Sequence, residues 1–246
     1  MSHLWSVERF KMARSKCLFW ILCGIAVITF LYVIGIHPDY PMLGMHGMHS
    51  PARLEILLTM WFPVFIAYFV AMEFQHKTIN DALCLGKSRL AVYLIKLTSV
   101  LTSVAVMVLF IMVGVTVGLT LIFGFGDIGV VEYVRHFVQS FVLQVFFQFS
   151  VASLFLMMAF IVKTPTFMVI IGVGYTFVTW VGVALLQIHL EGRYAFIGEF
   201  LPGLVHMEAI PRNDIDGIIY GSIVSVIWIV VTTAVGYFVF KRTDLK

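Results

Sequence analysis

Charged side chains are scarce in this chain. Only 12% of its 246 residues are Asp, Glu, Lys or Arg, whereas soluble domains carry about 25%. Apolar residues make up 61% of the sequence, and the mean hydropathy is +1.02. This balance excludes an ordinary soluble domain and predicts a membrane protein.

Cysteines are also few. The chain has three, Cys17, Cys23 and Cys84, and an odd number cannot pair completely. The first two lie in an apolar stretch and the third in an expected cytoplasmic loop, so a disulfide framework is excluded. We interpret all three as small apolar residues.

Charge is missing from six long apolar stretches, apart from Glu55 near the start of the second. A helix needs about 20 apolar residues to cross a bilayer, and a charge at its centre would cost about 2.5–3.5 kcal/mol. No connection reaches the roughly 50 residues of an independent domain. We therefore predict an all-α polytopic membrane protein with one membrane domain over residues 1–246. Its expected transmembrane helices are Cys17–Ile36, Leu54–Met72, Leu97–Phe123, Phe137–Val162, Thr166–Gln187 and Ile218–Phe240.

Basic residues are rare on one side of the expected bundle. Of the sixteen Lys and Arg residues, twelve fall in segments on the side of the amino terminus, and the other side holds only Arg53, Arg135, Arg193 and Arg212. The positive-inside rule then puts both termini in the cytoplasm. Orientation and anionic inner-leaflet lipid account for the net charge of +3, so we expect no nucleic-acid partner.

Motifs for nucleotide binding and catalysis are incomplete or missing. Gly86-Lys87-Ser88 matches the end of a phosphate loop, but Asp81 stands where that motif requires its first glycine. A carboxylate there would repel phosphates, so we expect no ATP binding by this chain. The sequence has no H-E-x-x-H or G-x-S-x-G motif and no pair of acids within a span. We therefore expect no enzymatic activity, and an intramembrane enzyme is the weaker alternative.

The segment Glu73–Lys96 is the only expected cytoplasmic connection of any size. Within it, residues 78–85 have the pattern of a short helix: Thr78 can cap it, Asp81 lies in its first turn, and Gly86 can end it. The apolar side of this helix consists of Ile79, Ala82, Leu83 and Leu85. We expect this side to enter a groove of a partner protein. The alternative is a lipid-facing interfacial helix. Glu73 is placed to pair with Arg89 or Lys96.

These features resemble the ABC-2 type permeases, the membrane subunits of bacterial ABC exporters. The resemblance rests on six spans with both ends inside, a glutamate after the second span, a Lys-Thr-Ile helix, and Gly-Lys-Ser-Arg before the third. Its sequence-specific part is confined to Glu73–Lys96. It is strongest with the small permeases of the bacteriocin-immunity and peptide-export group.

The resemblance implies a multi-pass protein of the bacterial inner membrane that works with other chains. It implies a separate ATPase subunit in two copies, which binds ATP and Mg, and a second permease chain that is identical or paralogous. This chain itself would hold no cofactor and no metal. Residues implied to couple it to the ATPase are Glu73, Thr78, Ile79, Asp81, Ala82, Leu83, Leu85, Gly86 and Arg89.

Two segments outside the spans fit the same family. Residues 1–16 carry Trp5 and Phe10 among four basic residues, which is typical of an inner interfacial segment. The apolar segment Tyr194–Ile210 is interrupted by Pro202-Gly203, which predicts a re-entrant hairpin in the outer leaflet. We interpret Phe200, Pro202 and Gly203 as an outer gate.

Polar and small residues within the spans suggest how the helices pack. Ser140, Gln144 and Gln148 repeat every four residues on one face, and either line the substrate pathway or form a hydrogen-bonded seam. Gly114 and Gly118 predict close helix packing. Pro63 predicts a kink in the second span, which is either a hinge or static packing.

The resemblance implies the permease subunit of an ATP-driven exporter that works by alternating access. The nearly uncharged interior favours a hydrophobic or amphipathic substrate, most directly a peptide, with lipid-like or drug molecules as the alternative. The Gly-Met-His repeat within residues 42–49 offers soft copper ligands, but without cysteines or paired acids it defines no metal geometry. Copper handling is therefore a weaker alternative.

Overall fold

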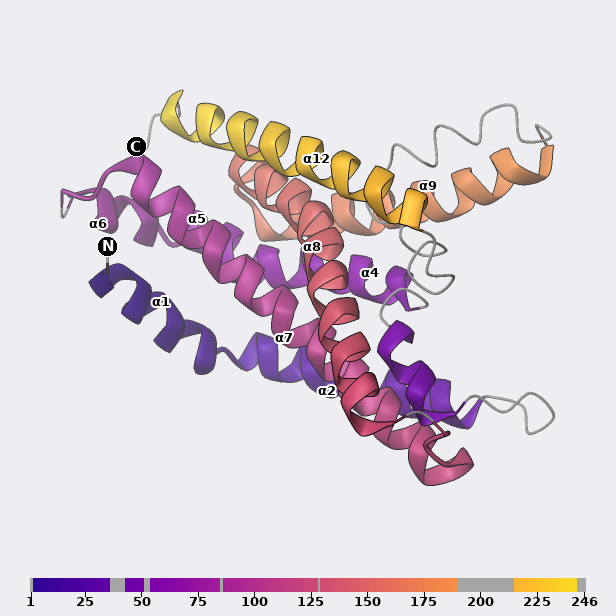
Figure 1. Cartoon of the computed structure of the whole chain (residues 1–246). Coiled ribbons are helices and arrows are strands. Elements are labelled where there is room, and N and C mark those ends of the chain that lie inside the picture. The colour runs from indigo at the N-terminus through magenta and orange to yellow at the C-terminus, as the bar shows by residue number, and fades with distance from the viewer. Residues whose placement is uncertain are drawn as a thin grey trace.

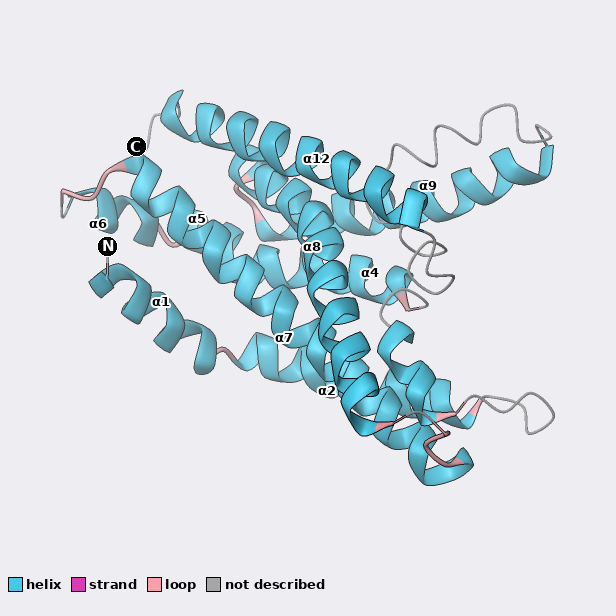
Figure 2. Ribbon diagram, viewed as in Figure 1, coloured by secondary structure: helices cyan, strands magenta, loops and turns pink. Residues whose placement is uncertain are grey.

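The computed structural model describes residues 2–35, 43–50, 54–84, 86–127, 129–189 and 215–242. All regular elements within these ranges are helical, in agreement with the predicted fold class (Figures 1 and 2). They are α1 (Ser2–Ala13), α2 (Lys16–Ile34), η1 (Gly44–His49), α4 (Glu55–Ile66), η2 (Ala67–Ala71), α5 (Met72–Gln75), α6 (Thr78–Cys84), α7 (Arg89–Phe123), α8 (Val130–Val162), α9 (Pro165–His189) and α12 (Ile215–Arg242).

Five stretches in the described ranges are long and apolar enough to cross a membrane. They are α2, the run Leu58–Gln75 through α4, η2 and α5, and the helices α7, α8 and α12. Helix α9 has 25 residues and coincides with the fifth expected span, and its fully described part is the apolar segment Pro165–Thr179. The chain is therefore a multi-pass membrane protein, and a sixth crossing stays a prediction.

Two helices extend well beyond the predicted spans. Helix α7 has 35 residues, which corresponds to about 52 Å, whereas the hydrocarbon core is about 30 Å thick. It begins at Arg89 rather than Leu97, and α8 begins at Val130 rather than Phe137. Charged residues mark the edge of the apolar stretch, but Lys, Arg and Glu are good helix formers, so the helices continue past it.

The amino-terminal helix, α6 and the end of α12 lie at the same end of the bundle (Figure 1). At this end the Arg89 guanidinium joins the start of α7 to the end of α12, because its Nη1 donates to the carbonyls of Phe240 at 2.7 Å and Lys241 at 2.9 Å. This arrangement fits termini on one side of a membrane, although which side they face stays a prediction. The expected outer segment Tyr194–Ile210, with Phe200, Pro202 and Gly203, lies outside the described residues.

Small residues bring the helices of the core together. A Cβ placed on Gly114 would lie 3.3 Å from Thr29, and one on Gly118 would lie 3.0 Å from Val33, so α2 packs directly on the backbone of α7. This confirms the close packing predicted for the two glycines. Elsewhere α12 packs along α8, and α4 packs on α9 and α8.

The second span changes its helical geometry after Pro63. A proline lacks the N–H that an α-helix needs, which weakens the hydrogen-bond ladder. Here the Ala67 N–H points at the carbonyls of both Pro63 and Val64, and a π-helix follows over Ala67–Ala71. The Pro63 ring also lies against Gly172 of α9, at the place a Cβ would occupy. The predicted irregularity is therefore real, and it coincides with a helix crossing.

Candidate functional site

The Gly-Lys-Ser triplet separates two helices. Gly86 has a φ of +77° and its N–H donates to the Leu83 carbonyl at 2.9 Å, so it ends α6 as predicted. Ser88 begins α7, because its Oγ accepts the Ala91 N–H at 3.2 Å. The hydroxyl that a phosphate loop would direct to magnesium therefore caps a helix. Among the described residues no strand precedes the triplet, which supports its interpretation as a helix stop.

Helix α6 uses part of its apolar side to pack on its own chain. The Ile79 side chain is only 2% exposed and belongs to the hydrophobic core, and Leu83 packs against the same core. The expectation that both enter a partner's groove is therefore wrong for Ile79. The physical reason is that a helix of seven residues is unstable alone and needs tertiary contacts. The side chains of Asp81 and Ala82, and the whole of Leu85, lie outside the description.

The described residues that are exposed around α6 are mostly polar. The exposed residues here are His76, Lys77, Thr78, Cys84, Gly86, Lys87 and Ser88. Thr78 is the first residue of the helix, and its hydroxyl donates to the Glu73 carbonyl at 3.4 Å. A partner that contacts this surface would therefore meet hydroxyl, thiol and basic groups.

Glu73 pairs with Lys96, one of the two partners that the sequence suggested. The Lys96 Nζ lies 2.7 Å from Glu73 Oε2 and 2.8 Å from Glu8 Oε2, and it sits 4.7 Å above the Phe69 ring. The lysine is only 2% exposed, so this is a buried ion pair. The other suggested partner, Arg89, instead supplies donors to the last carbonyls of α12.

Two residues of α1 extend this pair into a network of four charges. The Lys11 Nζ lies 3.2 Å from Glu8 Oε1 and 3.2 Å from Glu73 Oε1. We call Glu8, Lys11, Glu73 and Lys96 the ion lattice, in which each carboxylate contacts both ammonium groups. Burial lowers the pKa of Lys11, but the Glu73 and Glu8 carboxylates outweigh it, so that pKa is raised above its ordinary value. Sequence reasoning missed Glu8 and Lys11, for which the only signal was their i,i+3 spacing.

The polar row of α8 faces the interior of the chain. The Ser140 Oγ donates to the Met48 carbonyl at 3.0 Å, and the Gln144 Nε2 donates to the same carbonyl at 2.7 Å. Gln144 and Gln148 are 0% exposed, and Ser140 is buried as well. In this conformation the row is not open to solvent, and its role as a pathway lining stays a prediction. The geometry supports the alternative, a hydrogen-bonded seam, here between α8 and η1.

We expect Gln144→Leu to lower the free energy of unfolding by about 1–3 kcal/mol, because it removes the two hydrogen bonds that the Gln144 amide donates to the Met48 carbonyl and to the Ser140 hydroxyl. Thermal unfolding of the purified chain measures the loss. Val142→Leu, an exposed change on the same helix, is the matched control and should have little effect. Unchanged stability together with altered substrate selectivity would instead favour a pathway role.

The Gly-Met-His repeat forms η1 and packs on α7. Gly44 lies against Thr120 and Gly47 against the backbone of Thr116, where a Cβ would come within 2.6 Å of the Thr116 Cα. Within the part of the chain that the structure describes, no group of three His, Cys, Asp or Glu side chains could hold a metal ion. The glycines of this repeat thus have a packing role, which their spacing alone did not reveal.

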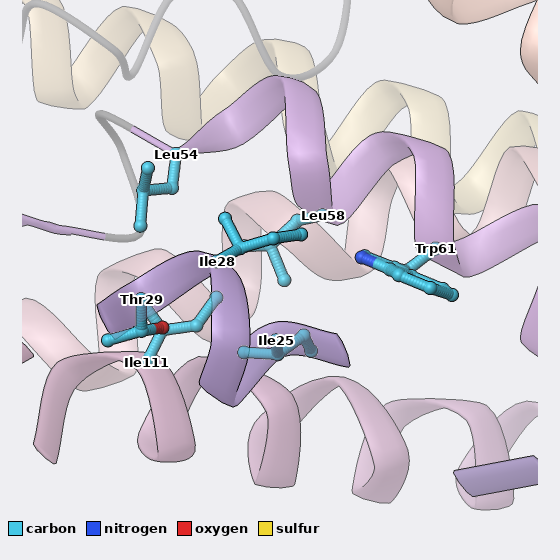
Figure 3. A pocket seen from close by; sticks show the side chains of 7 residues that line it. All are labelled: Ile25, Ile28, Thr29, Leu54, Leu58, Trp61 and Ile111. Atoms are coloured by element: carbon cyan, nitrogen blue, oxygen red, sulfur yellow. The ribbon is translucent and has the colours of Figure 1, made fainter. Parts of the chain in front are cut away.

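A small pocket between α2, α4 and α7 is apolar (Figure 3). Its lining residues are Ile25, Ile28, Thr29, Leu54, Leu58, Trp61 and Ile111. The Thr29 hydroxyl is buried and makes no hydrogen bond to any described residue. Among the described lining residues the polar groups are this hydroxyl and the Trp61 indole, neither of which carries a charge that would bind an ion.

Comparison with known families finds a model that matches most of the chain. A family model described as "ABC-2 family transporter protein" matches residues 4–179 of the 246-residue chain. The match begins within α1 and runs into α9, so it includes α6 and the whole ion lattice. A search of curated proteins finds no match.

Proposed function

Because the chain belongs to the ABC-2 family of transporter proteins, we propose that it is the permease subunit of an ATP-driven exporter in a bacterial inner membrane. Members of this family are transporter membrane proteins and normally work with an ABC ATPase partner. We further place the chain in the bacteriocin-immunity and peptide-export group, on the Lys-Thr-Ile and Gly-Lys-Ser-Arg residues of its cytoplasmic connection.

The observation that carries this proposal is the attachment of α6. The Ile79 side chain of α6 is buried in the core. Glu73, five residues before α6 begins, forms an ion pair with Lys96 of α7. A force applied to the exposed surface of α6 would therefore move the inner ends of the second and third spans with it. This is the mechanical property that a coupling helix requires. Because the phosphate loop of this chain is incomplete, ATP and Mg would bind to two partner ATPase subunits.

The proposed mechanism is alternating access in a transporter with two permease chains. ATP would close the two ATPase subunits, the two copies of α6 would approach one another, and the spans would rotate about their packed crossings. Pro63 contacts Gly172 beside the π-helix Ala67–Ala71, where the regular α-helical hydrogen bonds of the second span are interrupted. We propose it as the pivot of the second span.

The substrate we propose is a hydrophobic or amphipathic peptide. The buried ionisable groups in the described core, Glu8 and Lys96, neutralise each other at the inner end of the bundle. The rest of the described interior therefore offers an ionic solute no buried charge to bind. A lipid-like molecule has the same apolar chemistry, and the transport test below distinguishes it from a peptide.

Transport is expected in inverted membrane vesicles that contain the chain and its partner ATPase. ATP should drive uptake of hydrophobic peptides from a labelled peptide library, and substitution of the ATPase's phosphate-loop lysine should abolish uptake. The purified chain alone should hydrolyse no ATP. Uptake of small ions without any peptide, or of a fluorescent phospholipid in preference to peptides, would contradict the peptide assignment.

A further inference from the structure

We propose that α1 positions the coupling helix, through Glu8 and Lys11 of the ion lattice. This inference rests on the proposed role of α6 in ATPase coupling. It assigns the amino-terminal helix a part in energy transfer, in addition to the lipid contacts that its exposed aromatic and basic residues suggest.

The order of the lattice residues along the chain supports this role. Glu73 comes five residues before α6 begins, and Lys96 comes eight residues after Ser88, which begins α7. The two residues therefore flank the coupling segment on both sides. Glu8 contacts Lys96 at 2.8 Å, and Lys11 contacts Glu73 at 3.2 Å, so α1 is bound to both flanks of α6 at once.

Burial makes these contacts strong. The Lys96 side chain is 3% exposed, that of Glu8 is 8% exposed and that of Glu73 is 17% exposed. Ion pairs that are shielded from water to this extent resist separation, because a charge left alone would be buried without a partner. The more exposed Lys11 completes the neutralisation, with two carboxylates against two ammonium groups.

The remaining surface of α1 is mostly free to follow the membrane. Met12 packs on the core and accepts a contact from the Ser103 hydroxyl at 3.1 Å, whereas Val7, Arg9 and Phe10 are exposed. The described contacts of α1 with the rest of the chain thus include the Met12 side chain on the core and the four charges of the lattice. Displacement of α1 would be transmitted by the charged pairs to the base of α6.

The lattice can be disconnected from α1 without a charge imbalance. A single Glu8→Gln change would leave two ammonium groups on one carboxylate. The double change Glu8→Gln with Lys11→Gln instead leaves the Lys96–Glu73 pair at 2.7 Å intact and neutral. The second and third spans should therefore stay folded, while the ion pairs that join α1 to them are lost.

The test measures the distance between α1 and α6 by electron spin resonance in the full chain in lipid nanodiscs. Spin labels are attached to Cys84, which is exposed, and to Ala13→Cys, in a background with Cys17→Ala and Cys23→Ala. The intact lattice should give one narrow distance distribution, and the double variant a distribution at least about twice as wide. Arg9→Gln with Lys16→Gln, two exposed charges outside the lattice, is the control and should keep it narrow.

The second readout is ATP hydrolysis by the complex of the chain with its partner ATPase. The double variant should lower it by at least about 5-fold, and the control should not. An unchanged distance distribution, equal broadening in the control, or broadening without loss of hydrolysis would each overturn the positioning role. None of these results would bear on whether α6 binds the ATPase. If α6 does not bind it, the wild-type chain and the ATPase will already fail to form a complex.

Discussion

Lys96→Met should destabilise the chain by about 3–5 kcal/mol, because it leaves the Glu8 and Glu73 carboxylates buried with only the half-exposed Lys11 between them. The same substitution also removes the cation that sits 4.7 Å above the Phe69 ring. Denaturant unfolding of the purified chain, or the yield of folded protein, measures the loss.

Two further variants make this prediction specific. Lys87→Met removes an exposed lysine on the same connection and should cost less than about 1 kcal/mol. Lys96→Met combined with Glu8→Gln leaves the neutral Lys11–Glu73 pair and should recover most of the lost stability, a non-additive result. If Lys96→Met unfolds like the wild type, or if the second change destabilises it further, the lattice is not a stabilising unit.

Gly172→Val should cost about 3 kcal/mol, because the Pro63 ring already occupies the position of the new Cβ. Neither the proline ring nor the helical backbone can rotate away, so α4 and α9 would have to separate along their crossing. We expect a lower unfolding temperature and, in the complex, loss of ATP-driven transport.

Gly174 provides the matched control for this crossing. It lies two residues away on the same helix, and a Cβ there would meet no atom within 4 Å. Gly174→Val should therefore leave stability nearly unchanged. Pro63→Gly, which removes both the Cβ and the Cγ that lie next to Gly172, should make room and reduce the additional cost of Gly172→Val. Equal effects of the two valines would show that the Pro63 contact does not limit the packing of α9.

The helices were predictable from the sequence because apolar length is a local property. The starts of α7 and α8 were not, since a charge at the membrane surface ends the apolar stretch but does not end the helix. Gly86 as a helix stop followed from its position, and its positive φ agrees.

The contacts of the candidate site were harder to predict. The pattern of α6 identified an apolar side, but could not show that the chain's own core covers Ile79. The spacing of Ser140 and Gln144 gave their common face, but not the Met48 carbonyl opposite it. Glu73 and Lys96 lie at the two ends of the same connection, 23 residues apart, and could be paired from the sequence. Glu8 is 88 residues from Lys96, and only the fold brings the two together.

The central claim, that the ATPase binds at α6, is tested most directly by crosslinking from Cys84. The chain with Cys17→Ala and Cys23→Ala carries a photoreactive maleimide on this exposed thiol, in membranes that also contain the partner ATPase. Mass spectrometry should identify the crosslinked product as a chain with a complete G-x-x-x-x-G-K-[ST] phosphate loop. The same probe on a cysteine at Lys163, in the other expected cytoplasmic connection, should capture little of it. Capture of the ATPase from residue 163 but not from Cys84 would contradict the account.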